Sequence, residues 1–307
     1  MIRRRQQQGV ALITAMLIFA LVTSVTLGLA FDSTIDARRS MVLITRDQAA
    51  QVALGAESWI ASILRDDLSG SETDHLGEIW ATELPGLPIE GGEVFGGIED
   101  LQGRFNVNNL VDDNGVIDEE SVDQFRRLLN ALGLDPRYAG ITADWLDRDI
   151  EPSFPDGAED TFYSTVIPPY RTPNQRIANA SELLAILDMD SSVFEHLEPH
   201  IVALPGRTRI NVNTATPAVL QSLSETLSAS DVERLIEERA DAGFSDLVGT
   251  FSSLVEPDVL NELDEASQFF QLRVAVRIDT VRITFSSVLQ RGPNGEVVPI
   301  LRSFGSF

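Results

Sequence analysis

The chain has 307 residues, of which 43% are hydrophobic and 23% charged, which is the composition of a globular protein with a substantial core. Its formal net charge of −24 argues against general nucleic-acid binding, because a phosphate duplex repels an acidic surface. The chain has no cysteine, which excludes disulfides, a thiolate metal site and a cysteine nucleophile.

The N-terminus combines a basic leader with an apolar run. Residues 1–9 contain three arginines, and residues 10–31 form a run of 22 residues without a charge. As a helix this run would extend ~33 Å, which is long enough to cross a bilayer. The positive-inside rule predicts a single-pass protein with its N-terminus in the cytoplasm and the rest of the chain on the other side. One interpretation is a plain signal anchor, since the run is too long for an ordinary secretory signal peptide.

Gly9 supports a second interpretation, because it lies between the polar leader and the apolar run. A short basic leader, a glycine and an uninterrupted apolar helix are typical of class III signal peptides. Prepilin peptidase cuts such peptides on the cytoplasmic side, directly after the glycine. This interpretation predicts cleavage between Gly9 and Val10.

We expect the helix to continue beyond the membrane. Residues 32–67 contain no proline, and their apolar side chains fall on one face at helical spacing. A continuous helix from residue 10 to about residue 65 would be ~84 Å long. Such a helix, half in the membrane and half amphipathic outside it, resembles the spine of type IV pilins. The alternative is an anchor followed by a separate helix, with a break near Asp32 and Ser33.

After this helix, the pattern predicts strands followed by a helical segment. Residues 68–92 are rich in Gly, Ser and Pro and are predicted to form a loop. Residues 93–110 are predicted to form a strand pair with turns at Gly96–Gly97 and Gln102–Gly103. The segment 112–265 is acidic and mostly helical in pattern. Its predicted helices lie near residues 118–133, 139–148, 180–188, 191–198, 215–227, 229–241 and 256–264.

Strands return towards the C-terminus. Alternating apolar residues predict strands around Leu272–Ile278 and Val281–Phe285, with a turn near Asp279–Thr280. A last strand is expected at Val297–Leu301. The strand and helix pattern predicts an α/β domain behind the long helix, interrupted by an all-α domain. With the resemblance of that helix to the type IV pilin spine, this implies an α+β, type IV pilin-like fold: a long N-terminal helix packed on an antiparallel sheet, with a large all-α domain inserted between strands. The predicted parts are the leader 1–9, the spine helix 10–67 (10–31 transmembrane), the α/β domain 68–111 and 266–307, and the inserted domain 112–265.

Seven carboxylates crowd into residues 144–160, where Pro152, Pro155 and Gly157 favour a loop. Such a density of acids repels itself unless a cation or solvent compensates it. Oxygen ligands on a bent loop suit Ca²⁺, and the lack of Cys and His nearby argues against zinc or copper. The predicted calcium ligands are Asp144, Asp147, Asp149, Asp156, Glu159 and Asp160.

A solvated acidic loop is the alternative to the calcium site, since most charge runs are solvated. The ion is favoured because aromatic residues, among them Trp145, Phe162 and Tyr163, are interleaved with the acids. Burial of these aromatic side chains would draw the carboxylates towards a medium of low dielectric constant, where a charge has to be compensated.

Other segments suggest other functions. Residues 209–220 and 242–251 resemble a helix-hairpin-helix, but the hairpin position, 224–231, has acids and no glycine, so the phosphate-binding backbone of DNA-binding members is missing. The alternative function is a membrane-anchored periplasmic protein for DNA binding or uptake. A third class is an anchored periplasmic hydrolase with paired carboxylates such as Asp147 and Glu159. His196 and His200 lack the order of a metalloprotease motif and are interpreted as surface histidines.

Taken together, the motifs resemble one known family. They are QQQGVALITAMLI at the start of the apolar helix, DLQGRFNVNNL at 100–110, DWLDRD at 144–149, GAED at 157–160, PPYR at 168–171, NASEL at 179–183 and LPGRTRINVNTATPAVL at 204–220. In order and spacing they cover nearly the whole chain and are similar to general secretion pathway protein K, the minor pseudopilin K family of type II secretion.

The resemblance implies a structural role rather than an enzymatic one. It implies cleavage between Gly9 and Val10, methylation of the new Val10 amine, and a place at the tip of the periplasmic pseudopilus after insertion in the inner membrane. It implies as partners prepilin peptidase, the minor pseudopilins I, J and H and exported exoproteins, but no nucleic acid. Members of the family bind Ca²⁺ in the α-domain, which here corresponds to the GAED segment with Asp147 and Asp149.

One departure from the pilin pattern concerns residue 14. Most pilins carry Glu at the fifth mature position, where it can pair with the N-terminal amine of a neighbouring subunit inside the apolar helix bundle. In this chain the position is Thr14. A subunit without that Glu would suit the first position of a filament, which has no subunit ahead of it.

Overall fold

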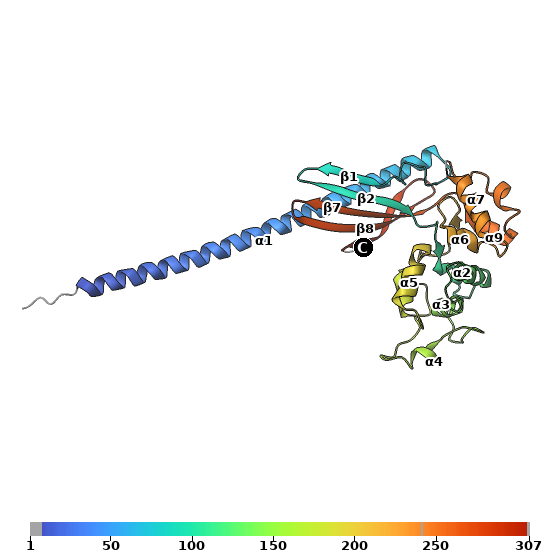
Figure 1. The fold of residues 1–307 in the computed structure, drawn as a ribbon, viewed down its shortest axis with the longest axis horizontal. Coiled ribbons are helices and arrows are strands. Elements are labelled where there is room, and N and C mark those ends of the chain that lie inside the picture. Colours follow the sequence, from blue (N-terminus) through green and yellow to red (C-terminus); the bar gives the residue numbers. More distant parts are fainter. Residues whose placement is uncertain (1–7, 241, 306–307) are drawn as a thin grey trace, which may run out of the picture.

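The first element is a single long helix. The computed structural model describes residues 8–240 and 242–305, so most of the leader lies outside the described residues. Helix α1 (Gln8–Gly70) runs without interruption for 63 residues. It contains no proline, and no break occurs near Asp32, so the prediction of a continuous helix is confirmed. Figure 1 shows its N-terminal half as a free rod and its C-terminal half lying along the sheet.

The C-terminal half of α1 packs on a five-stranded antiparallel sheet with the order β1-β2-β7-β8-β9. The strands are β1 (Leu84–Ile89), β2 (Gly92–Asp100), β7 (Phe269–Ile278), β8 (Val281–Arg291) and β9 (Val297–Phe304). The alternation predicted for the C-terminal strands is confirmed, because every second side chain of β7 is buried. Asp279, with φ of 51°, forms the predicted turn into β8.

The core between helix and sheet combines small and large side chains. Ala49 and Ala53 of α1 are fully buried, and Ile60 and Leu64 follow on the same face of the helix. Their partners on the sheet belong to one hydrophobic cluster, which includes Val94, Phe270, Leu272, Val274, Val276, Phe285 and Leu289. The apolar side chains that recur at helical spacing in the second half of the helix are therefore those that contact the sheet.

Strand β1 lies inside the segment that was predicted to be a loop. Its sequence, LPGLPI, carries two prolines and Gly86, whose φ is 111°, and its pairing with β2 is irregular between Leu84 and Leu87. Proline indicates a turn in a sequence pattern, but an edge strand tolerates it because an outward N–H needs no partner. The loop prediction for residues 84–89 is therefore wrong.

The predicted turn at Gly96–Gly97 is also wrong, because β2 continues through both glycines to Asp100. The glycine at position 96 serves another purpose. A Cβ there would lie 2.2 Å from the carbonyl oxygen of Arg273 on β7. Gly96 therefore permits a close approach of two backbones rather than a reversal of the chain.

Between β2 and β7 the chain forms a helical region with a hydrophobic core of its own. Its α-helices are α2 (Glu119–Ala131), α3 (Tyr138–Leu146), α4 (Asp160–Tyr163), α5 (Ser191–Leu197), α6 (Pro217–Ser222), α7 (Ala229–Arg239), α8 (Leu247–Phe251) and α9 (Pro257–Asn261). Short 3₁₀ helices and two parallel strand pairs connect them: η1 (Val107–Leu110), η2 (Ala180–Ala185), η3 (Glu198–His200), β3 (Phe105–Asn106) with β4 (Ile201–Val202), and β5 (Ile210–Asn211) with β6 (Leu263–Asp264).

Most of the helices agree with the prediction, and the differences have local causes. The segment predicted as a helix over 180–188 is the 3₁₀ helix η2, and the helix predicted over 215–227 is reduced to α6. Helices α4 and α8 were not predicted, because four and five residues are too short to show a helical period. Figure 1 shows the helical region beyond the end of the sheet that faces away from the free half of α1.

Candidate functional site

The acidic segment after α3 is held in place by aromatic side chains. The rings of Trp145 and Tyr163 lie 5.2 Å apart, and Tyr170 lies 5.2 Å from Tyr163. The hydroxyl of Tyr163 accepts a hydrogen bond from the N–H of Leu187, and that of Tyr170 donates to the carbonyl of Ala185. These contacts bury Trp145 and Tyr163 and fasten the segment to the rest of the helical region.

Three carboxylates of this segment come together, and we call Asp147, Asp149 and Glu159 the loop cluster. An oxygen of each lies within 4.8 Å of an oxygen of the other two. Asp147 follows the last residue of α3, and Glu159 precedes the first residue of α4, so two helix ends position them. Asp147 is 2% exposed and Glu159 0% exposed, whereas Asp149 lies at the surface.

The charge of the loop cluster is not balanced by the described part of the chain. Oδ1 of Asp147 and Oε1 of Glu159 are buried and have no hydrogen-bond partner there. Burial, followed by the charges of Asp149, Asp144 and Glu159, raises the pKa of Asp147 to about 7. Burial also raises the pKa of Glu159, against a hydrogen bond from the Thr172 hydroxyl at 2.9 Å.

The other predicted ligands lie outside this set of three. Asp144 is fully buried, its carboxylate accepts the N–H of Ser153 at 3.1 Å, and burial raises its pKa. Asp160 accepts the N–H of Thr172 at 3.1 Å. Asp156 is half-buried. The structure therefore brings together three of the six predicted residues.

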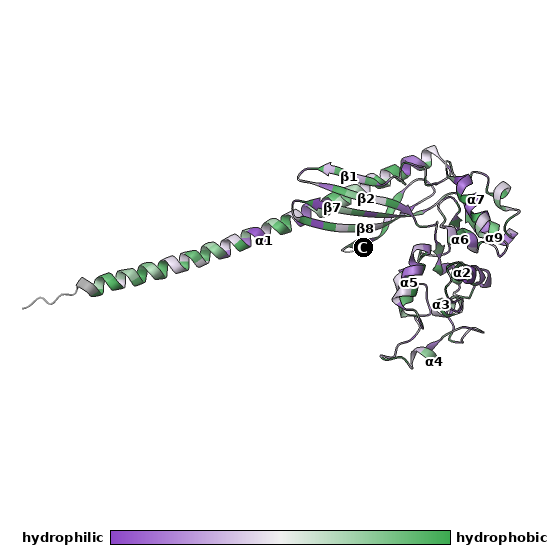
Figure 2. Ribbon diagram, in the orientation of Figure 1, coloured by the Kyte–Doolittle hydropathy of each residue, from purple (hydrophilic) through white to green (hydrophobic). Residues whose placement is uncertain are grey.

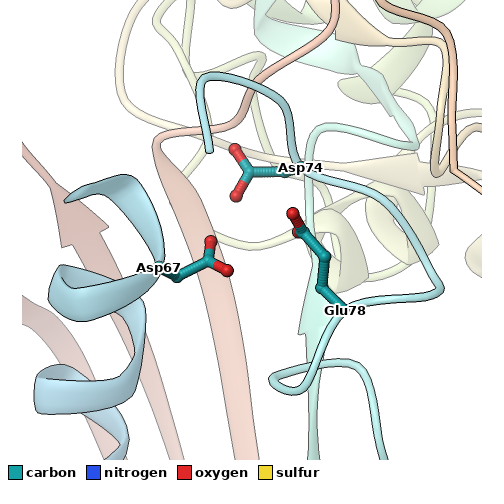
Figure 3. Close-up of side chains that lie close together, drawn as sticks. All are labelled: Asp67, Asp74 and Glu78. Atoms are coloured by element: carbon teal, nitrogen blue, oxygen red, sulfur yellow. The ribbon is translucent and has the colours of Figure 1, made fainter. Parts of the chain in front are cut away.

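A second acidic group was not predicted, and we call Asp67, Asp74 and Glu78 the junction cluster (Figure 3). An oxygen of each lies within 4.8 Å of an oxygen of the other two. Asp67 belongs to the last turns of α1, and Asp74 and Glu78 belong to the segment that leads to β1. Five acids lie among residues 66–78, so the local density of charge was present in the sequence. The group was missed because Asp67 was assigned to the predicted spine helix, whereas Asp74 and Glu78 were assigned to the predicted loop after it.

The N-terminal half of α1 presents apolar side chains to its surroundings. Its large residues, such as Leu17, Phe19 and Phe31, are more than half exposed, and Figure 2 shows this half as mostly hydrophobic. In the described part of the chain, α1 is the one helix long and apolar enough to cross a membrane. The hydroxyl of Thr14 donates to the carbonyl of Ala11 at 3.0 Å, so this polar group is satisfied within the helix. The peptide bond between Gly9 and Val10 lies in the first turns of α1.

In the hairpin between α6 and α7, which resembles a helix-hairpin-helix in sequence, polar side chains of the hairpin itself cap the backbone N–H groups. Ser228 and Asp231 form a reciprocal cap at the start of α7, which occupies the N–H of Asp231 and that of Ser228. Glu225 and Glu233 are exposed beside it.

The two predicted surface histidines differ in exposure. His200 is half-buried, and its Nδ1 lies 2.8 Å from the Thr216 hydroxyl, whereas His196 is exposed.

Comparison with known proteins identifies the family. Two family models described as type II secretion system (T2SS), protein K match residues 103–206 and 210–269. The type II secretion system protein K of Pseudomonas aeruginosa is 36% identical over 316 residues, which cover 98% of this chain and 94% of the relative. The chain belongs to the type II secretion system protein K family. The protein K of Pectobacterium carotovorum subsp. carotovorum is 32% identical, with 99% of this chain and 98% of the relative covered.

A solved protein K shares the fold. The structure is that of the GspK-GspI-GspJ complex from the type 2 secretion system of enterotoxigenic Escherichia coli, with a TM-score of 0.77 and 23% sequence identity over 88% of this chain and 100% of that chain. The predicted α+β fold is thus confirmed, and so is the resemblance to pseudopilin K. Protein K is a structural component of secretion and not an enzyme, which argues against the alternative of an anchored hydrolase.

Proposed function

We propose that this pseudopilin K caps the tip of the periplasmic pseudopilus, starts its assembly with other minor pseudopilins and helps to export folded exoproteins. The observation that carries the proposal is the position of the helical region. It lies beyond the end of the sheet that faces away from the free half of α1 (Figure 1). In a filament built from parallel spine helices, this bulk would obstruct the stacking of another subunit above.

The spine helix supports the membrane and assembly parts of the proposal. Its exposed apolar half would lie in the inner membrane as residues 10–31 before assembly, with the N-terminus in the cytoplasm and the head in the periplasm. Extraction into the filament would replace lipid contacts by contacts with neighbouring spine helices. Thr14 supplies no carboxylate to pair with the amine of a subunit ahead, which suits the first position.

The partners we propose are the minor pseudopilins I and J, with H below them. The support is the solved relative, whose structure is that of a complex of GspK with GspI and GspJ. The helical region, as residues 112–265, would project towards exoproteins, and the sheet, as residues 68–111 and 266–307, would dock on the partners.

The loop cluster is proposed to hold Ca²⁺. The donor set fits, because it consists of oxygen atoms alone and includes two buried oxygens without a partner, Asp147 Oδ1 and Glu159 Oε1. The ion would supply the positive charge that three crowded carboxylates need. Asp147, Asp149 and Glu159 would hold it, while Asp144, Asp156 and Asp160 would shape or extend the loop around them. Its role would be to stabilise the fold of the helical region, not to catalyse a reaction.

Processing tests the proposal at the N-terminus. We would co-express the full chain with a prepilin peptidase and measure the intact mass of the product. The expected product begins at Val10 and carries one added methyl group on its amine. A Gly9→Val chain is the matched control and should stay uncut. An uncut wild-type chain, next to a pilin that the same peptidase cleaves, would contradict the proposal and indicate an ordinary signal anchor.

The tip position needs a separate experiment. Because the chain has no cysteine, a single cysteine introduced by Val22→Cys on the exposed face of α1 gives cross-links without background. We expect disulfides with cysteines on the spine helices of pseudopilins I and J in assembled pili. Disulfides between two copies of this chain would show that it also occupies internal positions, and would contradict a single capping subunit.

A further inference from the structure

The junction cluster joins three parts of the fold. Asp67 comes from the end of α1, Asp74 and Glu78 come from the segment before β1, and Arg291 at the end of β8 lies against them. Figure 3 shows the three carboxyl groups turned towards the space between them. The peptide oxygen of Asp74 also accepts a hydrogen bond from Asn211 at 3.0 Å, which links the cluster to the helical region.

Arg291 balances only part of this charge. Its Nη2 pairs with Oδ2 of Asp74, and its Nη1 lies 3.4 Å from Oδ2 of Asp67. The same guanidinium donates to the carbonyls of Ser267 and Leu64, and the side chain is 3% exposed. One guanidinium therefore faces three carboxylates, and its donors are already directed at protein oxygens.

One oxygen of the cluster has no partner. Asp74 is 1% exposed, and its Oδ2 accepts from Arg291 and from the N–H of Ser267. Its Oδ1 is buried and makes no hydrogen bond within the described residues. A buried carboxylate oxygen without a partner is costly, so an oxygen-seeking ligand at this point would remove a penalty.

Glu78 is already fixed in position for such a ligand. Its Oε2 accepts from the indole Nε1 of Trp80 at 2.6 Å and from the N–H of His75 at 3.1 Å. These bonds orient the carboxylate without a second arginine. His75 Nε2 lies 3.7 Å from Oε1, and this imidazole is the other basic group at the cluster.

We propose that Asp67, Asp74 and Glu78 form a second divalent-cation site, with oxygen ligands that suit Ca²⁺, separate from the loop cluster. Oδ1 of Asp74 would be its buried ligand, and Asp67 and Glu78 would complete the protein ligands. The ion would fasten the end of the spine helix to the sheet where the helical region is attached.

The test counts ions on the full chain in detergent, with Asp149→Asn as a background that weakens the loop cluster. We would add Asp67→Asn or, as the matched control, Asp66→Asn, which changes the exposed acid one residue earlier. Equilibrium dialysis with radioactive calcium should find one ion fewer on the Asp67→Asn chain than on the Asp66→Asn chain. Equal numbers of ions on the two chains would overturn the proposal.

Terbium luminescence provides an independent readout of the same site. Trp80 donates directly to Glu78, so its excitation should sensitise a Tb³⁺ ion held there. In the Asp149→Asn background, the Tb³⁺ signal should be smaller in the Asp67→Asn chain than in the Asp66→Asn chain, and the part that remains belongs to the loop cluster, where Trp145 is the donor. Equal signals from the two chains would overturn the proposal. If Asp67→Asn fails to fold, as judged by its melting temperature in chelator, Glu78→Gln replaces it, because a glutamine Oε1 can still accept from Trp80. If the melting temperatures of the Asp66→Asn, Asp67→Asn and Glu78→Gln chains depend on pH but not on calcium, the carboxylates of the junction cluster share a proton rather than an ion. That result would also overturn the proposal.

Discussion

The loop cluster and the junction cluster hold the same number of carboxylates but differ in how their charge is balanced. Within residues 8–240 and 242–305 no arginine pairs with Asp147, Asp149 or Glu159, whereas Arg291 lies against both Asp67 and Asp74. Each cluster takes its three acids from one short stretch of chain, residues 147–159 and residues 67–78, but the arginine of the junction cluster comes from β8, which is distant in the sequence. A tertiary contact thus supplies the junction cluster with a cation of its own, while the described part of the chain supplies none to the loop cluster.

The largest effect should follow from removing that cation. Arg291→Met would leave the carboxylates of the junction cluster buried without their partner, and we expect the free energy of unfolding to fall by about 3–5 kcal/mol. Urea denaturation of the full chain in detergent measures it. Arg282→Met is the matched control, since this residue lies exposed on the same strand, and should change stability by less than about 0.5 kcal/mol. Equal effects of the two substitutions would show that the junction cluster needs no cation.

The second largest effect on stability should come from removing calcium from the loop cluster. At a calcium concentration of about 100 times the dissociation constant, ion binding stabilises the fold by about 2.7 kcal/mol, so chelator should lower the melting temperature. Asp147→Asn should lose this response in large part, because it removes a buried ligand. Glu151→Gln, an exposed acid of the same loop, should keep it. If the melting temperature of the Asp147→Asn chain responds fully to calcium, the loop cluster does not bind the ion.

In chelator, the loop cluster should also make stability depend on pH. The pKa of Asp147 is about 7 in the folded chain and 3.8 for an ordinary aspartate, so the folded state binds this proton more tightly. The resulting stabilisation is complete below about pH 3.8 and is lost as the pH rises through about 7. The unfolding free energy of wild type minus that of Asp147→Asn should therefore fall between pH 5 and pH 8. A difference that stays constant or rises over this range would contradict the buried, ion-free state of the carboxyl.

The smallest effect should come from an exposed ion pair at the rim of the loop. Arg171 is largely exposed and lies 3.7 Å from Asp160, which is not part of the loop cluster. Arg171→Ala should change the free energy of unfolding by about 0–0.5 kcal/mol, as is usual for exposed ion pairs. Thermal unfolding at saturating calcium measures this value, and a loss above about 1 kcal/mol would show that this pair contributes more than an ordinary exposed ion pair.

The candidate sites show where prediction from sequence reaches its limit. The loop cluster was predicted because its acids and aromatic residues lie close together in the chain, although the pattern did not distinguish Asp147 and Glu159 from Asp144 and Asp160. Their roles differ because Asp144 finds the N–H of Ser153 and Asp160 that of Thr172, and these partners depend on how the loop closes. The acids of the junction cluster are also close together in the sequence, but they lie across the predicted boundary between helix and loop, and their arginine is 217 positions from Asp74.

The sequence by itself determined the long helix, the alternating C-terminal strands and the acidic loop, because each depends on the spacing of neighbouring residues. It also carried the motifs that place the chain in its family. Only the tertiary structure decided that β1 forms the sheet edge, that Gly96 lies against a neighbouring backbone, and that Asp74 meets Arg291 across 217 positions. These features depend on which segments come into contact, and contacts between distant segments follow from packing around a common core rather than from any local pattern.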